Sequence, residues 1–182
     1  MATIGMATIG KRSNFERLAG DQYDTPLDAV GALLPHLDGV VRYIEPCCGN
    51  MCLVEALGQL APGLVCGFAG DIKYGFDALT LKASDIVRYG ADAIITNPPW
   101  TRALLHPLIA HFSGLAPTWL LFDADWGHTK QACSLLPRCS HIVAVGRVRW
   151  IRDSPHSGKD NACWYRFHAQ HKGPTKFIGR EP

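Results

Sequence analysis

The stretch Val40-Val41-Arg42-Tyr43-Ile44-Glu45-Pro46-Cys47-Cys48-Gly49-Asn50 decides the fold class of the chain. Its first half is rich in β-branched and aromatic residues and predicts a short strand at residues 40–45. Its second half, residues 46–50, predicts a tight turn, because proline and glycine interrupt regular structure there. The apolar spacing of residues 51–60 then predicts a helix. A strand that passes through a turn into a helix is the first part of a β-α-β unit.

The same alternation of strands and helices continues in both directions from this unit. The predicted strands are residues 64–69, 93–96 and 118–122, and the predicted helices are residues 27–34, 102–112 and 128–136. Thr25 is expected to cap the first of these helices, and Pro107 to kink or restart the second. The repeated β-α-β spacing predicts a largely parallel sheet with helices on both faces.

The last two predicted strands, residues 141–150 and 162–168, are joined by a polar loop without a helix. They are therefore expected to pair as an antiparallel hairpin. We expect an α/β fold whose single, doubly wound and mostly parallel sheet ends in this hairpin. The length of 182 residues suits one domain, which we assign to residues 21–170. Residues 1–20, which begin with a tandem repeat of Met-Ala-Thr-Ile-Gly, are expected to be poorly ordered, and residues 171–182 to form a basic tail.

Composition narrows the class of protein. Hydrophobic residues make up 47% of the chain and charged residues 19%, which excludes disordered, collagenous and disulfide-scaffold proteins. The longest uncharged run, residues 103–122, contains two histidines and two prolines and predicts two buried elements rather than a membrane helix. Seven cysteines, two of them adjacent, favour a reduced compartment. The opening residues do not resemble an export signal, so we expect a cytoplasmic protein without a membrane partner.

Positive charge is concentrated towards the C-terminal end of the chain. Residues 1–137 contain 9 Lys and Arg against 13 Asp and Glu, whereas residues 138–182 contain 9 against 3. Such an asymmetry is typical of a protein that binds a polyanion, although an ordinary solvated edge has the same composition. Arg147 and Arg149 share one face of a predicted strand. With Arg152, His156 and Lys159 in the following loop, they are the candidates for contacts with nucleic acid.

Three unusual segments follow three of the predicted strands, at the sheet edge where ligands of parallel sheets collect. They are Glu45–Asn50, residues 70–72 and residues 97–100. Gly49 lets the backbone approach a ligand closely, and Asp71 lies 22 residues beyond it, near the offset of about 20 residues at which an acid bonds ribose hydroxyls. The turn has no G-x-G-x-x-G pattern and no basic residue, so it favours a nucleoside without a pyrophosphate. The alternative is a tight turn followed by a surface aspartate.

Asn97-Pro98-Pro99-Trp100 is the most informative of the three segments. Two successive prolines remove two backbone donors, so this segment cannot continue a central strand and predicts a rigid loop. The side-chain oxygen of Asn97 and the carbonyl of Pro98 would then be two fixed acceptors for both hydrogens of an exocyclic amino group. Trp100 would offer a flat face to an unstacked base. The alternative is a proline-stiffened turn with a tryptophan in the core.

In these segments the chain resembles the S-adenosylmethionine-dependent amino methyltransferases, and most closely the small phage-type DNA adenine-N6 methyltransferases. The matching segments, in the order of the family, are residues 24–26, 45–50, 71–72, 76–79, 97–100 and 160–165. The resemblance implies a Rossmann-like class I methyltransferase fold with S-adenosyl-L-methionine as cofactor. It also implies methyl transfer to the N6 amino group of adenine, with double-stranded DNA as the expected partner.

The resemblance implies a role for each matched residue. The implied catalytic residues are Asn97, Pro98, Pro99 and Trp100. The implied cofactor contacts are Tyr23, Thr25 and Pro26 at the carboxylate, Glu45, Pro46, Cys47, Cys48, Gly49 and Asn50 around the methionine part, Asp71 and Ile72 at the ribose, Asp77 and Ala78 at the adenine, and Asn97. Met51 and Cys52 stand where the family usually has a second glycine or another small residue.

Other interpretations stay open at this point. The same pair of acceptors would hold an amino group of RNA or the amide of a protein glutamine, and a catalytically silent binding module would share the fold. No metal site is predicted, because Cys47, Cys48 and Cys52 lack the C-x2-C spacing of structural zinc sites and are expected to pack beside the turn. Residues 123–126 either border a base pocket or form a simple turn at the end of a strand.

Overall fold

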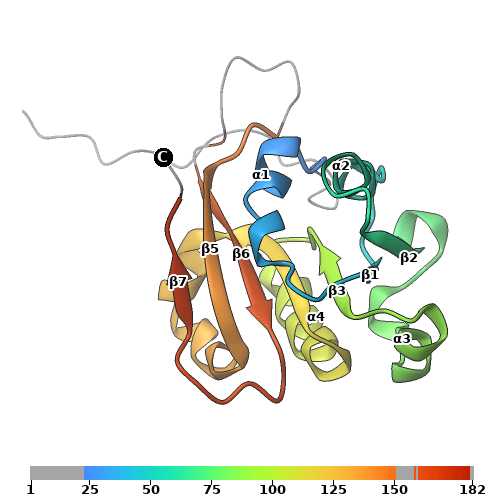
Figure 1. The fold of residues 1–182 in the computed structure, drawn as a ribbon. Helices are drawn as coiled ribbons and strands as arrows, with labels where there is room; N and C mark the ends of the chain where they lie inside the picture. The colour runs from blue at the N-terminus through green and yellow to red at the C-terminus, as the bar shows by residue number, and fades with distance from the viewer. Residues whose placement is uncertain (1–22, 151–157, 159, 181–182) are drawn as a thin grey trace, which may run out of the picture.

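The fold is built on a seven-stranded sheet, shown in Figure 1 from the computed structural model, which describes residues 23–150, 158 and 160–180. The strands are β1 (Arg42–Glu45), β2 (Val65–Ala69), β3 (Ala93–Thr96), β4 (Thr118–Asp123), β5 (Cys139–Arg147), β6 (Asn161–Phe167) and β7 (Lys176–Ile178). The α-helices are α1 (Leu27–Gly31), α2 (Cys52–Leu60), α3 (Ala83–Tyr89) and α4 (Arg102–Leu115). Short 3-10 helices are η2 (Leu34–His36), η3 (Ile72–Tyr74), η4 (Ala78–Thr80), η5 (Ala124–His128), η6 (Lys130–Ser134) and η7 (Leu136–Arg138).

The strands lie across the sheet in the order β2-β1-β3-β4-β6-β5-β7. β1 pairs in parallel with β2 and β3, β3 pairs in parallel with β4, and β5 with β7. β6 is antiparallel to both of its neighbours, β4 and β5. The predicted α/β fold, its mostly parallel sheet and the β5–β6 hairpin are therefore confirmed. Because β2 and β3 lie on opposite sides of β1, the chain order reverses there, and sheets of this kind bind ligands at that reversal.

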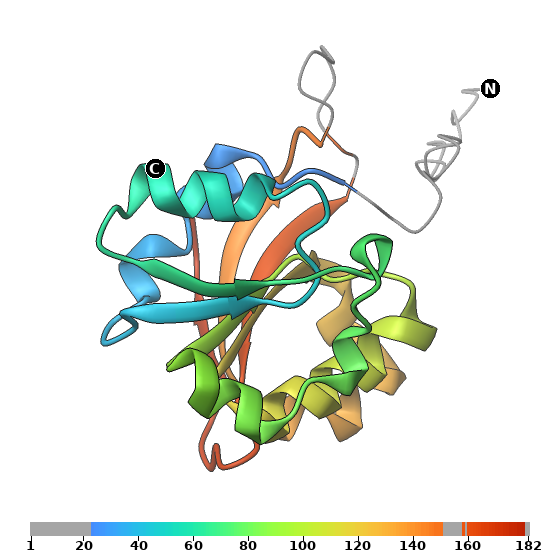
Figure 2. The same cartoon turned by 90° about the vertical axis from the view of Figure 1, so that its right-hand side faces the viewer.

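Helices cover both faces of the sheet, α1 and α2 on one and α3 and α4 on the other (Figure 2). Alternate residues of β3 point to opposite faces of the sheet. Ala93 and Ile95 pack in the cluster with α1 and α2, and Ile94 packs in the cluster with α4. All four residues of β3 are buried, as expected of a strand between two helical layers. This alternation places the side chain of Asn97, the next residue of odd number, towards α1.

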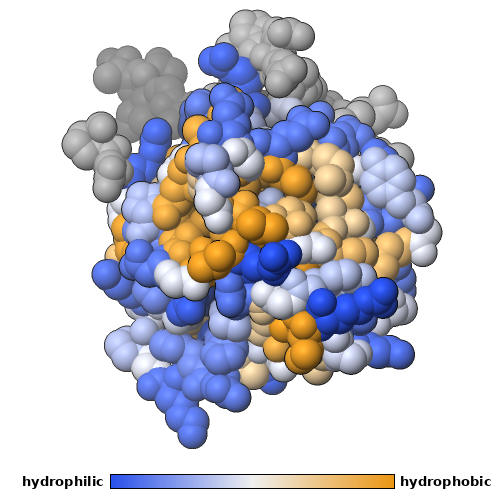
Figure 3. All heavy atoms as spheres, turned by 45° about the vertical axis from the view of Figure 1, so that its right-hand side comes forward, coloured by the Kyte–Doolittle hydropathy of each residue, from blue (hydrophilic) through white to orange (hydrophobic). Residues whose placement is uncertain are grey.

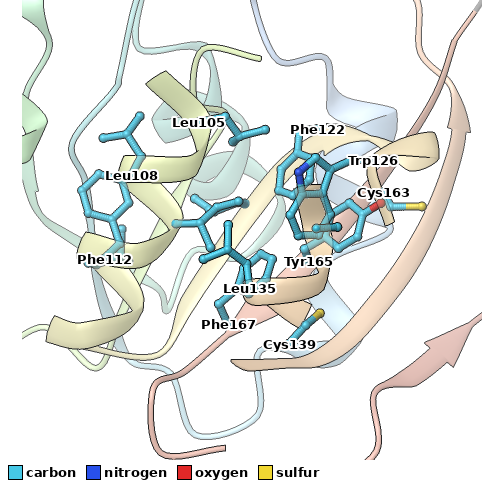
Figure 4. Packing of buried hydrophobic residues seen from close by; sticks show 14 of the residues in the cluster. Leu105, Leu108, Phe112, Phe122, Trp126, Leu135, Cys139, Cys163, Tyr165 and Phe167 are labelled. Atoms are coloured by element: carbon cyan, nitrogen blue, oxygen red, sulfur yellow. The ribbon is translucent and has the colours of Figure 1, made fainter. Parts of the chain in front are cut away.

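The core under α4 combines aliphatic side chains with a group of aromatic rings (Figure 4). Phe122 of β4 stacks on Tyr165 of β6 with ring centroids 4.1 Å apart, and Trp126 meets Phe122 edge-on at 5.2 Å. Phe112 of α4 is fully buried in the same cluster. Burial of each large ring contributes roughly 2–3 kcal/mol. This cluster fixes α4, and α4 begins directly after the turn at residues 97–100.

The first predicted helix is shorter than expected and begins differently. α1 ends at Gly31, and η2 follows it with Pro35 in its first turn. The N-cap residue is Pro26, not Thr25, and no side chain caps the helix. The prediction for Thr25 is wrong because its hydroxyl has another partner, the side-chain amide of Asn97. Pro107 does not restart α4, which continues from Arg102 to Leu115.

The α-helix predicted at residues 128–136 is absent, and η5, η6 and η7 occupy residues 124–138 instead. Buried or half-buried side chains recur there at every third residue, at Trp126, Thr129, Ala132 and Leu135. The backbone hydrogen bonds follow the same step, each N–H donating to the carbonyl three residues earlier. A repeat of three matches the 3-10 helix, whereas an α-helix repeats every 3.6 residues. The α-helix was wrongly predicted because this short apolar repeat resembles a helical one.

Besides short 3-10 helices, one α-helix and one strand were not predicted from the sequence. α3 ends at Gly90, whose φ of 60° is left-handed, and its start is fixed by the N–H of Lys82 donating to the Asp85 carboxylate at 2.8 Å. β7 lies in the segment expected to be a basic tail and pairs with β5 from His141 to Val143. The sheet therefore continues past residue 170. Residues 1–20, expected to be poorly ordered, lie outside the described residues.

Candidate active site

A cavity of about 340 Å³ opens where β1, β2 and β3 end. Its size lies within the range of sites for small molecules and cofactors. Glu45 ends β1, Asp71 follows β2 and Asn97 follows β3, and all three line the cavity. The three segments that the sequence singled out therefore meet at one place, on the side of the strand-order reversal.

Most of the predicted cofactor contacts line this cavity. They are Tyr23, Thr25, Glu45, Pro46, Cys47, Cys48, Gly49, Asn50, Asp71, Ile72, Asp77, Ala78 and Asn97. Of the predicted catalytic residues, Asn97 and Pro99 line the cavity, whereas Pro98 is buried and Trp100 packs against both core clusters. Pro26 is also outside the lining and serves as the N-cap of α1.

Seven further residues line the cavity that were not predicted as site residues. They are Asp24, Cys52, Leu53, Phe76, Leu79, Leu104 and Leu108. Asp24, Phe76 and Leu79 lie within the segments that carried the family resemblance, so that signal was present in the sequence. Leu104 and Leu108 are one turn apart on α4 and present one face of it. Without a known helix position, their spacing could not be distinguished from ordinary core.

The turn after β1 combines unusual backbone with a polar clamp. Gly49 has a φ of 50° and Met51 a φ of 68°, both in the left-handed region. The backbone N–H of Gly49 donates to Oδ2 of Asp71, and the N–H of Lys73 donates to Oδ1, each at 2.9 Å. Asp71 thus joins the turn after β1 to the turn after β2 and fixes both sides of the cavity. Its carboxylate oxygens keep further lone pairs for a ligand.

Glu45 is the most unusual side chain of the cavity. It is only 1% exposed, and its Oε2 atom has no hydrogen-bond partner among the described residues. Burial, with a smaller contribution from the charge of Asp71, raises the pKa of Glu45 well above its usual range. A buried acceptor without a partner is costly. A ligand that brings a cationic donor to Glu45 would remove this cost.

The charge of the cavity favours a cation. Three aspartate carboxylates, those of Asp24, Asp71 and Asp77, line it together with the buried carboxyl of Glu45. Among the described residues of the lining there is no Lys, Arg or His. Such a site attracts a positively charged ligand and disfavours a pyrophosphate.

Two thiols of the cavity, those of Cys47 and Cys48, are poor nucleophiles. Burial raises the pKa of Cys48 to about 11 and that of Cys47 further. Both therefore stay protonated at neutral pH and act as small apolar wall residues. Among the described residues, no group of three His, Cys, Asp or Glu side chains is placed to hold a metal ion.

The rim of the cavity is partly polar and partly apolar. The Asn50 side chain donates to the Asp24 carboxylate at 2.9 Å and accepts from the ammonium of Lys73, which links the segment before α1 to the two turns. Ile72, Leu79 and Leu104 line the cavity and are 70%, 41% and 49% exposed. Figure 3 shows one face of the molecule, on which hydrophobic residues form a patch bordered by hydrophilic ones. Exposed apolar side chains beside a cavity are typical of a ligand site.

The side chain of Asn97 is held from both ends. Its Nδ2 donates to the carbonyl of Tyr23 and to Oγ1 of Thr25, each at 3.2 Å. Its Oδ1 accepts from the indole N–H of Trp100 at 3.1 Å. A carbonyl only accepts and an indole N–H only donates, so these partners identify the oxygen end of the amide. One lone pair of Oδ1 is left for a donor from a substrate.

The basic face predicted for nucleic acid is only partly described. Arg147 and Arg149 are both exposed and Val148 between them is buried, so the two arginines share a side as predicted. Trp150 follows them and packs edge-on against Trp100 at 5.3 Å, so the segment that carries the two arginines passes near the turn at residues 97–100. Arg152, His156 and Lys159 lie outside the described residues.

Residues 123–126, expected either to border a base pocket or to form a simple turn, lie at the end of β4. Asp123, at the end of β4, is half-buried, and burial raises the pKa of its carboxyl. None of residues 123–126 lines the cavity. No helix in the described part of the chain is both long enough and apolar enough to cross a membrane.

No protein-family model and no curated protein matches the chain. Solved structures do match. One is a protein from Listeria monocytogenes assigned to the class I S-adenosylmethionine-dependent methyltransferases, with a TM-score of 0.53 and 10% identity over 91% of this chain and 68% of that one. Another comes from the type I R-M (restriction–modification) system, with a TM-score of 0.53 and 16% identity over 93% of this chain and 47% of that one.

At these identities the likeness is one of fold. It covers a chain with a mostly parallel seven-stranded sheet in which β6 is antiparallel to both of its neighbours. The chain therefore has the Rossmann-like fold of the class I methyltransferases.

Proposed function

We propose that this protein transfers a methyl group from S-adenosyl-L-methionine to the exocyclic N6 amino group of adenine in DNA. The observation that carries the proposal is the position of Asn97. Its amide, with the oxygen end identified by its partners, borders the same cavity as Gly49 and Asp71. A hydrogen-bond acceptor for an amino group and a site for a nucleoside cofactor thus lie side by side.

The residues of the cavity fit S-adenosyl-L-methionine. Glu45, whose Oε2 is unpartnered among the described residues, would accept from the ammonium of the cofactor, Asp71 would accept from ribose hydroxyls, and Ile72 with Leu79 would offer apolar surface to an adenine. The absence of basic side chains from the described lining agrees with a ligand that carries positive charge and no phosphate. When bound, the cofactor supplies a methyl carbon on a sulfonium. The bond of this carbon to sulfur breaks as the amino nitrogen forms its new C–N bond; sulfur keeps the bonding pair and leaves as a neutral thioether, and the methylated nitrogen then loses one proton to solvent.

Asn97 and Pro98 would prepare the amino group for this transfer. The lone pair of an adenine amino group is delocalised into the ring, which makes the nitrogen a weak nucleophile. When Oδ1 of Asn97 and the carbonyl of Pro98 accept its two hydrogens, they favour a pyramidal nitrogen with a localised lone pair. This is stabilisation by fixed dipoles together with positioning, and it needs no titrating base in the transfer step. In duplex DNA the base must first be flipped out, at a cost of a few kcal/mol.

The basic face would bind the phosphates of the nucleic acid. Arg147 and Arg149 are exposed on one side, and the guanidinium of Arg180 lies against Gly146 next to them. Their nearness to Trp100 through Trp150 supports contact with the strand that carries the flipped base. We include Arg152, His156 and Lys159 in this interface on the sequence pattern.

The decisive test supplies the cofactor with a labelled methyl group. The protein is incubated with it and with DNA, RNA or a protein pool, and the labelled pool is digested to nucleosides or amino acids. We expect label in N6-methyldeoxyadenosine, and none when Asn97→Ala replaces the wild type. Label in an RNA nucleoside or in methylglutamine would reject DNA as the substrate. Cofactor binding by calorimetry without any transfer would reject the enzyme in favour of a silent binding module.

A further inference from the structure

The sequence predicts that Trp100 stacks on a base, but its surroundings indicate another task. The ring is half-buried, packs against both core clusters and is outside the lining of the cavity. Its indole N–H donates to two acceptors at 3.1 Å, Oδ1 of Asn97 and the carbonyl of Leu121. Trp150 adds an edge-on contact at 5.3 Å. A ring held in this way has a fixed orientation, and its N–H points towards Oδ1 of Asn97.

The partners of the Asn97 amide differ in how strictly they set its orientation. The Trp100 N–H can only donate, and the Tyr23 carbonyl can only accept. The Thr25 hydroxyl can donate or accept a hydrogen bond, so it is compatible with both orientations of the amide. Without the indole N–H, only the Tyr23 carbonyl would keep the amide nitrogen away from the substrate. A reversed amide would present N–H groups to an amino group, and the two sets of donors would repel.

We propose that Trp100 is a positioning residue whose indole N–H sets the orientation of the Asn97 amide, so that a lone pair of Oδ1 faces the amino group to be methylated. This inference rests on the proposed function and deepens it. Trp100 acts through Asn97 and does not need to touch the substrate. The second N–H acceptor, the Leu121 carbonyl on β4, holds the indole in place while Asn97 engages its substrate.

The test removes the N–H and keeps the ring. Trp100→Phe retains an aromatic residue, and a benzothienyl analogue introduced at position 100 retains the two-ring outline with sulfur in place of the N–H. Loss of one hydrogen bond that orients a reacting group is expected to lower the single-turnover rate roughly tenfold in both. The KM for DNA and the cofactor affinity should stay within about twofold of the wild type, because neither depends on this N–H.

A stacking role gives the opposite result. The benzothienyl analogue keeps the stacking surface, so it would transfer methyl groups at the wild-type rate, and Trp100→Phe would mainly raise the KM for DNA. Either finding overturns the positioning role and leaves the proposed function intact.

Trp126→Phe is the matched control. The indole N–H of Trp126 donates to Nε2 of His106 at 3.0 Å, and neither residue lines the cavity. This variant loses the same kind of hydrogen bond from a more deeply buried ring. We expect it to lower the melting temperature and to leave the rate of transfer by the folded protein unchanged.

A second readout does not depend on activity. The side-chain amide of Asn97 gives a pair of proton–nitrogen NMR signals, which can be assigned by their loss in Asn97→Ala. In Trp100→Phe we expect these signals to shift or split, because the amide samples two orientations. Unchanged signals would overturn the inference even if no substrate were methylated, and a wild type that methylates nothing would overturn the proposed function alone.

Discussion

The two turns that border the cavity are built in opposite ways. The turn at residues 45–51 holds two left-handed residues, Gly49 and Met51, and a buried oxygen of Glu45 without a partner among the described residues. In the turn at residues 97–100, two prolines fix the backbone and both ends of the Asn97 amide are hydrogen-bonded. The first turn therefore carries costs that a ligand can relieve, and the second is organised before any ligand binds.

Because the two turns differ in this way, we expect substitutions in them to change different properties of the protein. A group that is already in place contributes to the rate of reaction, because no reorganisation is needed at that step. A group that waits for a partner contributes to affinity, and it lowers the stability of the empty protein. Substitutions in the first turn should therefore act on cofactor binding and stability, and substitutions in the second turn on the transfer rate.

The largest effect is expected at the organised turn. Asn97→Ala removes the acceptor for the amino group and should lower the single-turnover rate by about 10²–10³-fold or more. Cofactor affinity, measured by calorimetry, should stay within about threefold, because Asn97 is not one of the carboxylates that would hold the cation. A variant that keeps most of its activity, or loses cofactor binding in parallel, would break the contrast between the turns.

At the first turn, Glu45→Gln should separate affinity from stability. It removes a charge-assisted partner of the cofactor, so we expect affinity to fall roughly tenfold to a hundredfold. The empty protein should become more stable at neutral pH, because a buried ionisable group is replaced by a neutral one. Calorimetry and thermal unfolding measure the two changes. Loss of both affinity and stability would assign Glu45 to the framework of the fold instead of to the ligand.

The same residue predicts a dependence on pH. Its pKa is raised above the usual value of about 4.3, chiefly by burial. Its contribution to folding is therefore fully present below about pH 4.3 and is lost as the pH rises through the raised pKa. A bound cation lowers that pKa again, so cofactor binding should release protons. Titration calorimetry in buffers of different ionisation enthalpy should find up to one proton released by the wild type and none by Glu45→Gln; equal counts would contradict this linkage.

A smaller effect is expected from the arginines, which belong to neither turn. Arg147→Ala and Arg149→Ala should each weaken DNA binding and reduce the slope of log affinity against log salt by about 1. Transfer at saturating DNA should be unchanged. Arg88→Ala, an exposed arginine on α3, is the control with the same change of charge. If affinity for DNA does not depend on salt in the wild type, the arginines do not bind phosphates.

The parts of the fold that could be predicted depend on local signals. β3 agrees with its predicted bounds because an apolar run ends at two prolines, and the strand-turn-helix unit at residues 42–60 follows from its β-branched run and its glycine. β7 could not be predicted, since Lys176-Phe177-Ile178 is short and becomes a strand only by pairing with β5. The 3-10 helices required knowledge of which side chains are buried.

The candidate site was also predictable only in part. The turns at Gly49, Asp71 and Asn97 could be predicted from their residue types, and the topology of a parallel sheet brings the strand ends together. The direction in which a side chain points could not be predicted from residue type. Thr25 was expected to cap a helix and instead accepts a hydrogen bond from Asn97, and the indole of Trp100 donates within the protein. Thr25 and Asn97 are 72 residues apart in sequence, and Trp100 and Asn97 are 3 apart. In both pairs the geometry of the hydrogen bond is set only in the folded chain.

The smallest predicted effect concerns Met51, which occupies a left-handed conformation with a φ of 68°. A side chain in that region costs roughly 1–2 kcal/mol, and neither core cluster includes Met51, so little packing is lost on truncation. Met51→Gly should therefore stabilise the empty protein by about 1 kcal/mol in denaturant unfolding. Gly49→Ala, at a φ of 50° in the same turn, should destabilise it by a similar amount. If Met51→Gly lowered stability, the methionine would be holding the turn in shape, and the cost assigned to the first turn would rest on Glu45 alone.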